Sequence, residues 1–262
     1  MPDNKDDKLL LASLEDKLRQ CENKYYPTNS DFLDMSQQSL ADNNFRMRTA
    51  NYCFWGGYAA AERKVMVFLP DYIDARAARN DYGAIDPEAD PLVLLRAVPT
   101  AKDAALTHRD YLGALMGLGV KRAKIGDIIV DKAGADIIIL RDIADYLLLN
   151  YLKVGRYTLH TEILPVREVR YTAPVTQEKQ INVASLRLDT VAAGVFGCSR
   201  SKAVAAVAAG GLFVNGRQIT KPDHMLADGD TLVWRGKGRV DIAEIGGTTQ
   251  KGRVWLTINR YI

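Results

Sequence analysis

The sequence contains few of the residues from which metal sites, disulfides and membrane-spanning helices are built. It has only three cysteines and three histidines in 262 residues, and none lies in a CxxC or HExxH spacing, so we expect neither a zinc site nor a disulfide framework. Apolar runs are short, and none approaches the roughly 18 residues that a membrane-spanning helix needs. Residues 1–8 are polar and acidic, unlike a signal or transit peptide. These absences predict a cytoplasmic protein with no membrane partner and no metal.

What the sequence does have is ordinary globular composition and an uneven distribution of charge. Hydrophobic residues make up 47% and charged residues 26%, which excludes wholesale disorder. Residues 182–262 contain 11 Lys and Arg against 6 Asp and Glu, a net charge of +5, whereas residues 1–181 contain 24 against 26, a net charge of −2. Two interpretations of this basic excess stay open: a surface for a polyanion such as nucleic acid, or an inert basic surface.

Hydrophobic periodicity predicts an N-terminal helical and strand segment over residues 1–75. Apolar residues recur at helical spacing over residues 5–24, and Ser30 is expected to cap a second helix. The remaining predicted features are a turn over residues 54–58, a strand over residues 65–69 and a loop over residues 74–91.

Residues 76–172 show a regular alternation of strands and helices. Thr107 with Asp110 three residues later is a capping-box pattern that opens the first helix, and a second helix is expected over residues 143–151. Strands are predicted over residues 92–98, 128–130, 137–140 and 158–164. This βαββαβ order predicts a ferredoxin-like, RRM-like plait. The third strand of the plait lacks aromatic residues, which argues against base stacking by its sheet.

A second domain is expected over residues 183–262, after a polar segment, 171–182, that is interpreted as a linker. Two short helices are predicted, the first from Leu188 and the second from Ser199 or Arg200. The later features are a two-residue hairpin at Asn215-Gly216 and strands over residues 231–234 and 254–258. The predicted fold class is therefore α+β.

The C-terminal pattern resembles the S4 domain, a small RNA-binding module also called the αL motif. The resemblance is carried by residues 186–189, 199–203, 214–216, 221–222, 229–230 and 235–239. Arg200 and Lys202 fall in the first turn of a predicted helix, where free N–H groups and the positive helix end favour phosphate. Asp189 is expected to be structural and to orient an arginine. The RNA-binding residues expected in this domain are Arg187, Ser199, Arg200, Ser201, Lys202, Lys221, Arg235, Lys237 and Arg239.

The rest of the chain resembles the YlmH family of bacterial proteins. The resemblance is carried by residues 31–34, 56–58, 61–64, 68–72 and 125–128, and above all by residues 107–122, THRDYLGALMGLGVKR. The family pairs an RRM-like plait with a C-terminal S4 domain. The resemblance implies a role on the large ribosomal subunit in ribosome-associated quality control of stalled translation, with rRNA and peptidyl-tRNA as partners and no cofactor. Older descriptions link the family to cell division.

The function of Lys121 and Arg122 stays open at the level of the sequence. Both follow the first predicted helix of the plait and are candidates for contacts to RNA. Cations at this place equally stabilise a helix C-terminus without any ligand.

Two alternative functions have to be weighed against RNA binding. Pseudouridine synthases also carry S4 domains, and their catalytic aspartate lies in an Arg-Leu-Asp context like Arg187-Leu188-Asp189; here, however, too few residues follow for the synthase catalytic domain. Neither a catalytic triad nor a glycine-rich nucleotide loop is present, so we expect no enzyme and no small-molecule substrate. A cell-division-associated scaffold is the second alternative, and weak salt dependence of binding would distinguish it from an RNA-binding protein.

Overall fold

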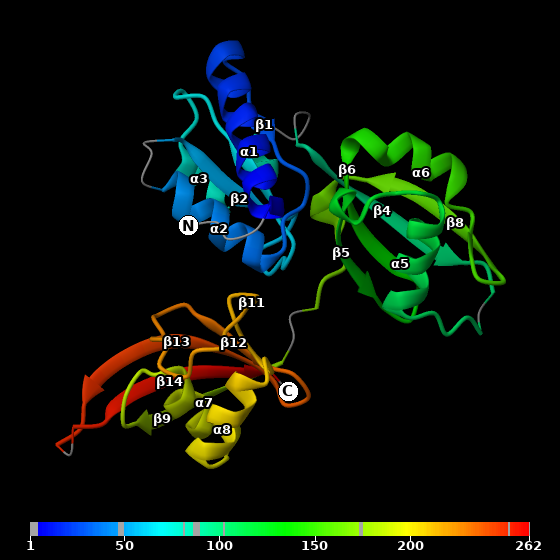
Figure 1. The fold of residues 1–262 in the computed structure, drawn as a ribbon. Coiled ribbons are helices and arrows are strands. Elements are labelled where there is room, and N and C mark those ends of the chain that lie inside the picture. The colour runs from blue at the N-terminus through cyan, green and yellow to red at the C-terminus, as the bar shows by residue number, and fades with distance from the viewer. Residues whose placement is uncertain are drawn as a thin grey trace. The chain divides into compact units, whose positions relative to one another are not determined.

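The computed structural model describes residues 5–46, 50–80, 82–85, 90–101, 103–172, 175–250 and 252–261. The chain divides into two compact units, an N-terminal unit, Met1–Thr172, and a C-terminal unit, Ala173–Ile262 (Figure 1). Each unit has a hydrophobic core of its own.

The N-terminal unit begins with a three-stranded antiparallel sheet, in the order β1-β3-β2, and helices packed on it. The elements of this segment are α1 (Lys5–Lys24), β1 (Thr28–Asn29), α2 (Met35–Phe45), β2 (Tyr52–Trp55), β3 (Val65–Phe68), α3 (Ala75–Asn80) and α4 (Tyr82–Ile85). The predicted helix over residues 5–24 and the predicted strand near residues 65–69 are confirmed.

Three predictions for this segment are wrong in whole or in part. Ser30 does not cap α2; the cap is Asp34, which forms a capping box with Gln37, while the Ser30 hydroxyl accepts a hydrogen bond from the N–H of Met66 (2.9 Å). The predicted turn begins later than expected, because Phe54 and Trp55 belong to β2 and pair with β3, and the chain bends only at Gly57 and Tyr58. The segment expected to be a loop contains α3 and α4, although residues 81 and 86–89 lie outside the described part.

The second half of the N-terminal unit is a five-stranded antiparallel sheet in the order β5-β6-β4-β8-β7. Its elements are β4 (Leu92–Pro99), α5 (His108–Gly117), η1 (Arg122–Lys124), β5 (Ile125–Val130), β6 (Ala135–Leu140), η2 (Arg141–Ile143), α6 (Ala144–Asn150), β7 (Lys153–Val154), β8 (Tyr157–Leu164) and η3 (Val166–Glu168). The Asp110 carboxylate accepts a hydrogen bond from the N–H of Thr107 (2.7 Å), as the capping pattern predicts, and a second one from the Thr107 hydroxyl (2.7 Å).

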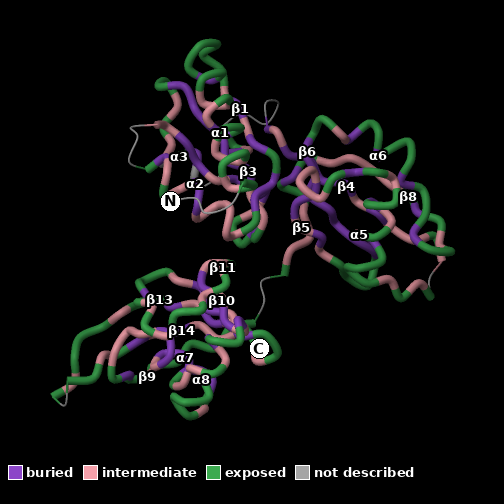
Figure 2. Tube along the Cα trace, in the orientation of Figure 1, coloured by how far each residue is buried: buried purple, intermediate pink, exposed green. Residues whose placement is uncertain are grey.

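Both faces of this sheet are covered within the N-terminal unit, as the burial along β4 and β6 in Figure 2 shows. On one face, Ile137 and Ile139 of β6 pack in a core to which α5 and α6 contribute. On the other face, Ile138 packs with Trp55 and Val65 of the first sheet. The face opposite the helices, which RRM domains use for RNA, is therefore part of a protein core here.

A set of hydrogen bonds around Asp127 and Arg63 connects the two halves of the N-terminal unit. The Asp127 carboxylate accepts hydrogen bonds from the hydroxyl of Tyr58 (2.9 Å) and from the N–H groups of Glu62 (2.7 Å) and Arg63 (3.1 Å). The Arg63 guanidinium in turn donates to the carbonyls of Ile125 and Phe32 (3.1 Å each). These residues lie in or beside the short motifs that carry the family resemblance, so those motifs have a structural role.

The C-terminal unit is a six-stranded antiparallel sheet in the order β11-β10-β12-β13-β14-β9, with two helices against one face. Its elements are β9 (Thr176–Val183), α7 (Leu188–Phe196), α8 (Arg200–Ala208), β10 (Leu212–Val214), β11 (Arg217–Gln218), β12 (Thr231–Trp234), β13 (Gly238–Thr248) and β14 (Val254–Tyr261). Asn215 and Gly216 have φ angles of 49° and 75°, which confirms the hairpin predicted there.

The interpretation of residues 171–182 as a linker is wrong for most of that segment. Residues 176–183 form β9, which pairs with β14 along its whole length, while residues 173 and 174 lie outside the described part. This strand could not be predicted from the sequence, because it is the exposed edge of the sheet and its sequence, TQEKQINV, has no alternation of apolar residues.

In the described part of the chain, no single helix is long and apolar enough to cross a membrane. The helices α7 and α8 pass that test only as a pair, by length and composition, with a bend of 117° between them.

Candidate nucleic-acid interface

The first group of predicted RNA-binding residues lies where α7 and α8 begin. Arg187 is the N-cap of α7, and Arg200 is the first residue of α8. The carboxylate of Asp189 accepts hydrogen bonds from the Nε atoms of Arg200 (2.9 Å) and Arg187 (3.3 Å). The Asp189 side chain is 2% exposed, whereas those of Arg200 and Arg187 are 59% and 38% exposed. The expectation that Asp189 orients an arginine is confirmed, and the structure brings two arginines together instead of one.

Electrostatics explain why this cluster keeps its charges. Burial of the Asp189 carboxyl raises its pKa, but hydrogen bonds from Arg187, Arg200 and Thr190 outweigh burial, so the pKa lies below its ordinary value. The carboxylate therefore stays ionised at neutral pH and fixes two guanidinium groups that also reach solvent. The group of two cations and one anion keeps one net positive charge.

The neighbouring candidates belong to the same end of the C-terminal unit. Ser199 is the N-cap of α8, and its hydroxyl accepts a hydrogen bond from the N–H of Lys202 (3.3 Å), so this side chain caps the helix. The side chains of Ser201 and Lys202 are exposed. Exposed Lys221 precedes Pro222, whose carbonyl accepts the N–H of Asp189 (3.1 Å). The segment that carries Lys221 is thus held against the start of α7.

The second group, Arg235, Lys237 and Arg239, lies at the turn between β12 and β13. The N–H of Arg235 donates to the carbonyl of Gly211 (3.0 Å), just beyond the end of α8, whereas Arg200 is at its start. The nine residues of α8 span about 13 Å. The predicted residues of this unit therefore form two groups, one near the start of α8 and one near its end.

Aromatic rings accompany the second group, and the sequence did not indicate these pairs. The Cζ atom of Arg235 lies 4.5 Å from the ring centroid of Phe213, and that of Arg239 lies 4.6 Å from that of Tyr261. The Nζ atom of Lys237 lies 4.5 Å from a ring centroid of Trp234, which itself belongs to the core. The distances are those of cation–π contacts.

The two candidates of the N-terminal unit have different environments. Lys121 is exposed and precedes the η1 helix. Arg122 is half-buried, and its Nη1 donates to the main-chain carbonyls of Ile125 and Gly126. Burial, together with the nearby charge of Arg63, lowers the pKa of Arg122 to about 10. The guanidinium of Arg122 thus serves the local main chain, and Lys121 is the more accessible candidate.

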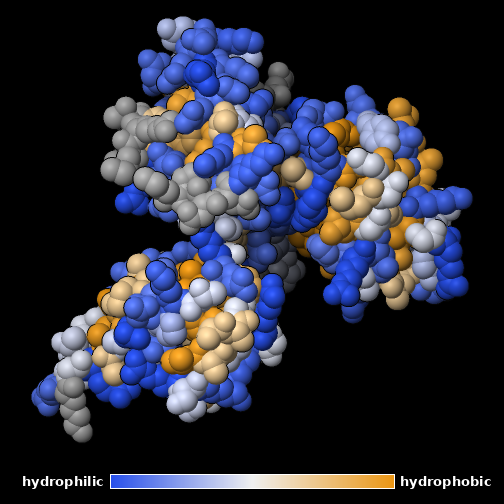
Figure 3. Space-filling view, viewed as in Figure 1, coloured by the Kyte–Doolittle hydropathy of each residue, from blue (hydrophilic) through white to orange (hydrophobic). Residues whose placement is uncertain are grey.

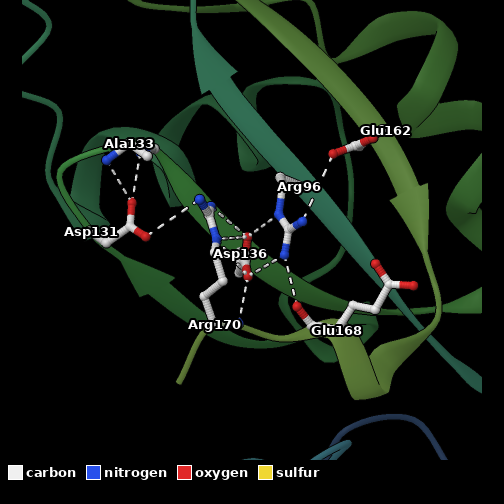
Figure 4. Close-up of polar contacts among 8 residues, drawn as sticks. Arg96, Asp131, Ala133, Asp136, Glu162, Glu168 and Arg170 are labelled. Atoms are coloured by element: carbon white, nitrogen blue, oxygen red, sulfur yellow. Dashed lines mark hydrogen bonds and ion pairs between the residues drawn. The ribbon is translucent and has the colours of Figure 1, made fainter. Parts of the chain in front are cut away.

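A buried charge cluster in the N-terminal unit is fully occupied by protein partners (Figure 4). Asp136 of β6 accepts two hydrogen bonds from Arg96 (2.9 and 3.0 Å) and one from Nη2 of Arg170 (2.8 Å). Burial opposes ionisation, but these arginines outweigh it and lower the pKa of Asp136 to about 2. Arg96 also donates to the carbonyl of Glu168 (2.8 Å). This arrangement ties β4 and β6 to the segment after η3, which is a structural role.

Some of the exposed apolar residues of the N-terminal unit lie on α6 or just after it, whereas others, such as Tyr25 and Tyr72, lie elsewhere. Leu149 is 73% exposed, Leu152 49% and Tyr146 47%. Figure 3 shows apolar side chains on this part of the unit among hydrophilic ones. Among the described residues, no group of three or more His, Cys, Asp or Glu side chains is arranged to hold a metal ion.

Comparison with known proteins identifies two families along the chain. Residues 91–168 match the family described as "Putative RNA-binding domain in YlmH", and residues 186–232 match the S4 domain. The chain is 30% identical over 257 residues to the ribosome-associated protein quality control protein P2 of Bacillus subtilis, covering 98% of this chain and 96% of that protein. The solved structure of the cell division protein ylmH from Streptococcus pneumoniae aligns with a TM-score of 0.49 at 22% identity, over 64% of this chain and 96% of that one.

Proposed function

The chain belongs to the YlmH family of RNA-binding proteins with a C-terminal S4 domain, and from this membership we propose that it acts in quality control of stalled translation. In this proposal it binds the large ribosomal subunit through rRNA and through the tRNA of the stalled complex. We place this function in the cytoplasm, because the relative from Bacillus subtilis is named as ribosome-associated.

The observation that carries the proposal is the arginine pair at Asp189. Arg187 and Arg200 lie at the starts of two helices inside the S4 match, and one buried carboxylate holds both. Helix starts and guanidinium groups each favour phosphate oxygens. Exposed Lys202 and the Lys221 segment extend the same surface. Such a fixed set of cations suits a folded RNA, which is recognised largely through its backbone and shape.

We further propose three parts for the chain: an N-terminal segment over residues 1–75, an RRM-like plait over residues 76–172, and the S4 domain over residues 183–262. In this proposal the plait contributes to binding through its rim, with Lys121 as the accessible cation, because the sheet face is covered.

The matched families are RNA-binding and ribosome-associated, and neither is a family of enzymes. Asp189 also lacks the setting of a pseudouridine synthase nucleophile, because Arg187, Arg200 and Thr190 occupy its carboxylate in a 2% exposed site. We therefore propose a binding function without catalysis.

Binding to separated ribosomal subunits tests this function. We expect salt-sensitive binding to the large subunit that improves when the subunit carries peptidyl-tRNA. Arg200→Ala and Lys202→Ala should each weaken binding by about 1–3 kcal/mol, because each removes a cation from the proposed surface. Lys179→Ala, which removes an exposed lysine from β9 in the same unit, is the matched control and should bind as the unchanged protein does.

Unchanged affinity in both Arg200→Ala and Lys202→Ala would contradict the assignment of this surface. Equal binding to the two subunits would contradict the role on the large subunit.

A further inference from the structure

The sheet of the C-terminal unit has an open face with cation–aromatic pairs on it. Leu212 and Val214 of β10 and Leu232 of β12 point into the core against α7 and α8. Because side chains alternate along a strand, Phe213 and Val233 lie on the opposite face. Both are half-buried rather than buried, so this second face is partly accessible to solvent.

One row of side chains crosses this open face. Phe213 pairs with Val233, and Val233 pairs with Arg239 of β13, so the three residues are neighbours on adjacent strands. The row continues to Tyr261 of β14 through the contact between the Tyr261 ring and the Arg239 guanidinium (4.6 Å). Exposed Arg235 lies over Phe213 at the other end of the row (4.5 Å). Two arginines are therefore each held over a ring on one surface.

The carboxylate of Asp241 fixes one of these pairs. It accepts a hydrogen bond from the hydroxyl of Tyr261 (2.6 Å) and another from the Nε of Arg239 (3.4 Å). The hydroxyl of Thr231 donates to Oδ1 of Asp241 (2.7 Å), the oxygen that also accepts from Arg239, whereas Tyr261 donates to Oδ2. Asp241 is thus a positioning residue, which aligns the Tyr261 ring with the Arg239 guanidinium, and the Arg239 side chain is 26% exposed to solvent.

A further aromatic residue lies on the same face. Trp255 of β14 alternates with buried Leu256 and is 41% exposed. A Cβ added at Gly246 would lie 3.3 Å from the Cβ of Trp255, so glycine permits a close approach of β13 to the main chain of Trp255. Tyr261 lies six positions after Trp255, a distance of about 20 Å along the strand.

We propose that this open face binds unpaired RNA bases by stacking them on the guanidinium groups of Arg235 and Arg239. Bases splayed out of a helix stack on aromatic rings and on arginine planes, and the arginine charges attract the neighbouring phosphates. The residues of this face between Tyr261 and Trp255, Asn259 and Thr257, are polar, which suits a nucleic acid better than the apolar centre of a protein interface. The inference rests on the proposed function and divides the S4 unit into a phosphate surface at Asp189 and a base surface on the sheet.

The test uses the full chain and a variant that keeps every charge. The double variant Arg235→Lys/Arg239→Lys retains two cations but loses the planar groups that stack. We expect it to bind a short labelled oligouridylate at least about fivefold more weakly, the equivalent of about 1 kcal/mol of stacking, and to bind a short labelled RNA duplex as before. Arg217→Lys in β11 of the same sheet is the matched control and should bind both probes normally.

A second variant keeps the experiment independent of any one arginine contact. Trp255→Leu changes an exposed side chain and should also weaken oligouridylate binding while the duplex is bound normally. Unchanged oligouridylate binding in both variants would overturn the inference, as expected if the face docks a protein instead. Equal weakening for oligouridylate and duplex would also overturn it, because the lost interaction would then be with phosphate. If the unchanged protein binds neither probe, the proposed RNA-binding function itself fails, which separates the two conclusions.

Discussion

Two buried aspartates, Asp136 and Asp189, each hold a pair of arginines, but the pairs differ in how far they reach solvent. The arginine side chains at Asp136 are 17% and 35% exposed, so their groups mainly serve the core. At Asp189 the more exposed arginine, Arg200, has 59% of its side chain in solvent. The same ionic arrangement therefore stabilises the first unit and presents cations on the second.

Replacement of Asp136 tests the stabilising role. Asp136→Asn should lower the free energy of unfolding by about 3 kcal/mol at pH 7, because it leaves Arg96 and Arg170 without a carboxylate in a mostly buried site. Burial raises the pKa of Asp136 but its two arginines lower it further, so the folded value, about 2, lies below the unfolded value of 3.8. The stabilisation is thus complete above about pH 4, and about 2 kcal/mol of it is lost as the pH falls toward 2.

Urea unfolding between pH 2 and pH 7 measures both effects. The variant should show a smaller fall in stability between pH 4 and pH 2 than the unchanged protein. Asp145→Asn, at an exposed carboxylate on α6, is the control and should retain the fall in stability between pH 4 and pH 2 that the unchanged protein shows. A variant profile parallel to that of the unchanged protein would contradict the role of Asp136.

At the scale of the elements, helix α5 contains two glycines that its fold does not require. Gly113 and Gly117 are exposed, neither has a positive φ angle, and a Cβ at either position would meet no atom within 4 Å. Gly113→Ala and Gly117→Ala should each raise the free energy of unfolding by about 0.5–1 kcal/mol, because alanine restricts the unfolded chain and favours the helix.

Thermal unfolding of the single variants measures this gain. Gly126→Ala is the opposite control: its Cβ would lie 2.7 Å from the ring of Phe32, so this variant should unfold at a lower temperature. A loss of stability in both α5 variants would show that the helix depends on these glycines.

The elements that sequence reasoning located are those with a strong local signal. The period of α1 and the turn at Asn215-Gly216 are encoded in adjacent residues, and both are confirmed. By contrast, α3 has six residues and is held by packing of Ala78 in a core made from distant strands. Strand β9 is defined only by its pairing with β14, about 80 residues further along the chain.

The same distinction applies to the candidate site. Cations at helix starts and turns can be recognised from sequence, and so can the role of Asp189, which lies two residues from Arg187. The rings over which Arg235 and Arg239 lie could not be predicted. Phe213 and Tyr261 are 22 residues from these arginines, and only the register of the sheet brings them together.

At the scale of the whole molecule, the covered sheet predicts which fragments fold. A fragment of residues 173–262 keeps a complete core and should fold alone with a cooperative transition.

A fragment of residues 91–172 would expose Leu92, Leu94 and Ile138, which pack on the first sheet in the intact unit, and should aggregate or bind a hydrophobic dye. The matched control, residues 1–172, retains that cover and should remain monomeric. Circular dichroism and sedimentation measure these outcomes, and a stable, monomeric 91–172 fragment would contradict the structural role of the first 90 residues.

The carboxylate of Asp189 has a consequence for the entropy of association. A free arginine side chain samples many rotamers, and holding it against a ligand costs about 2 kcal/mol at most. Arg187 and Arg200 have already lost much of this freedom, because Asp189 restrains both when the unit folds. The entropy cost of ordering these two side chains is therefore included in the free energy of folding and does not reduce the affinity for a ligand. An RNA backbone that reaches them meets groups already in place, so more of the contact free energy is retained as affinity.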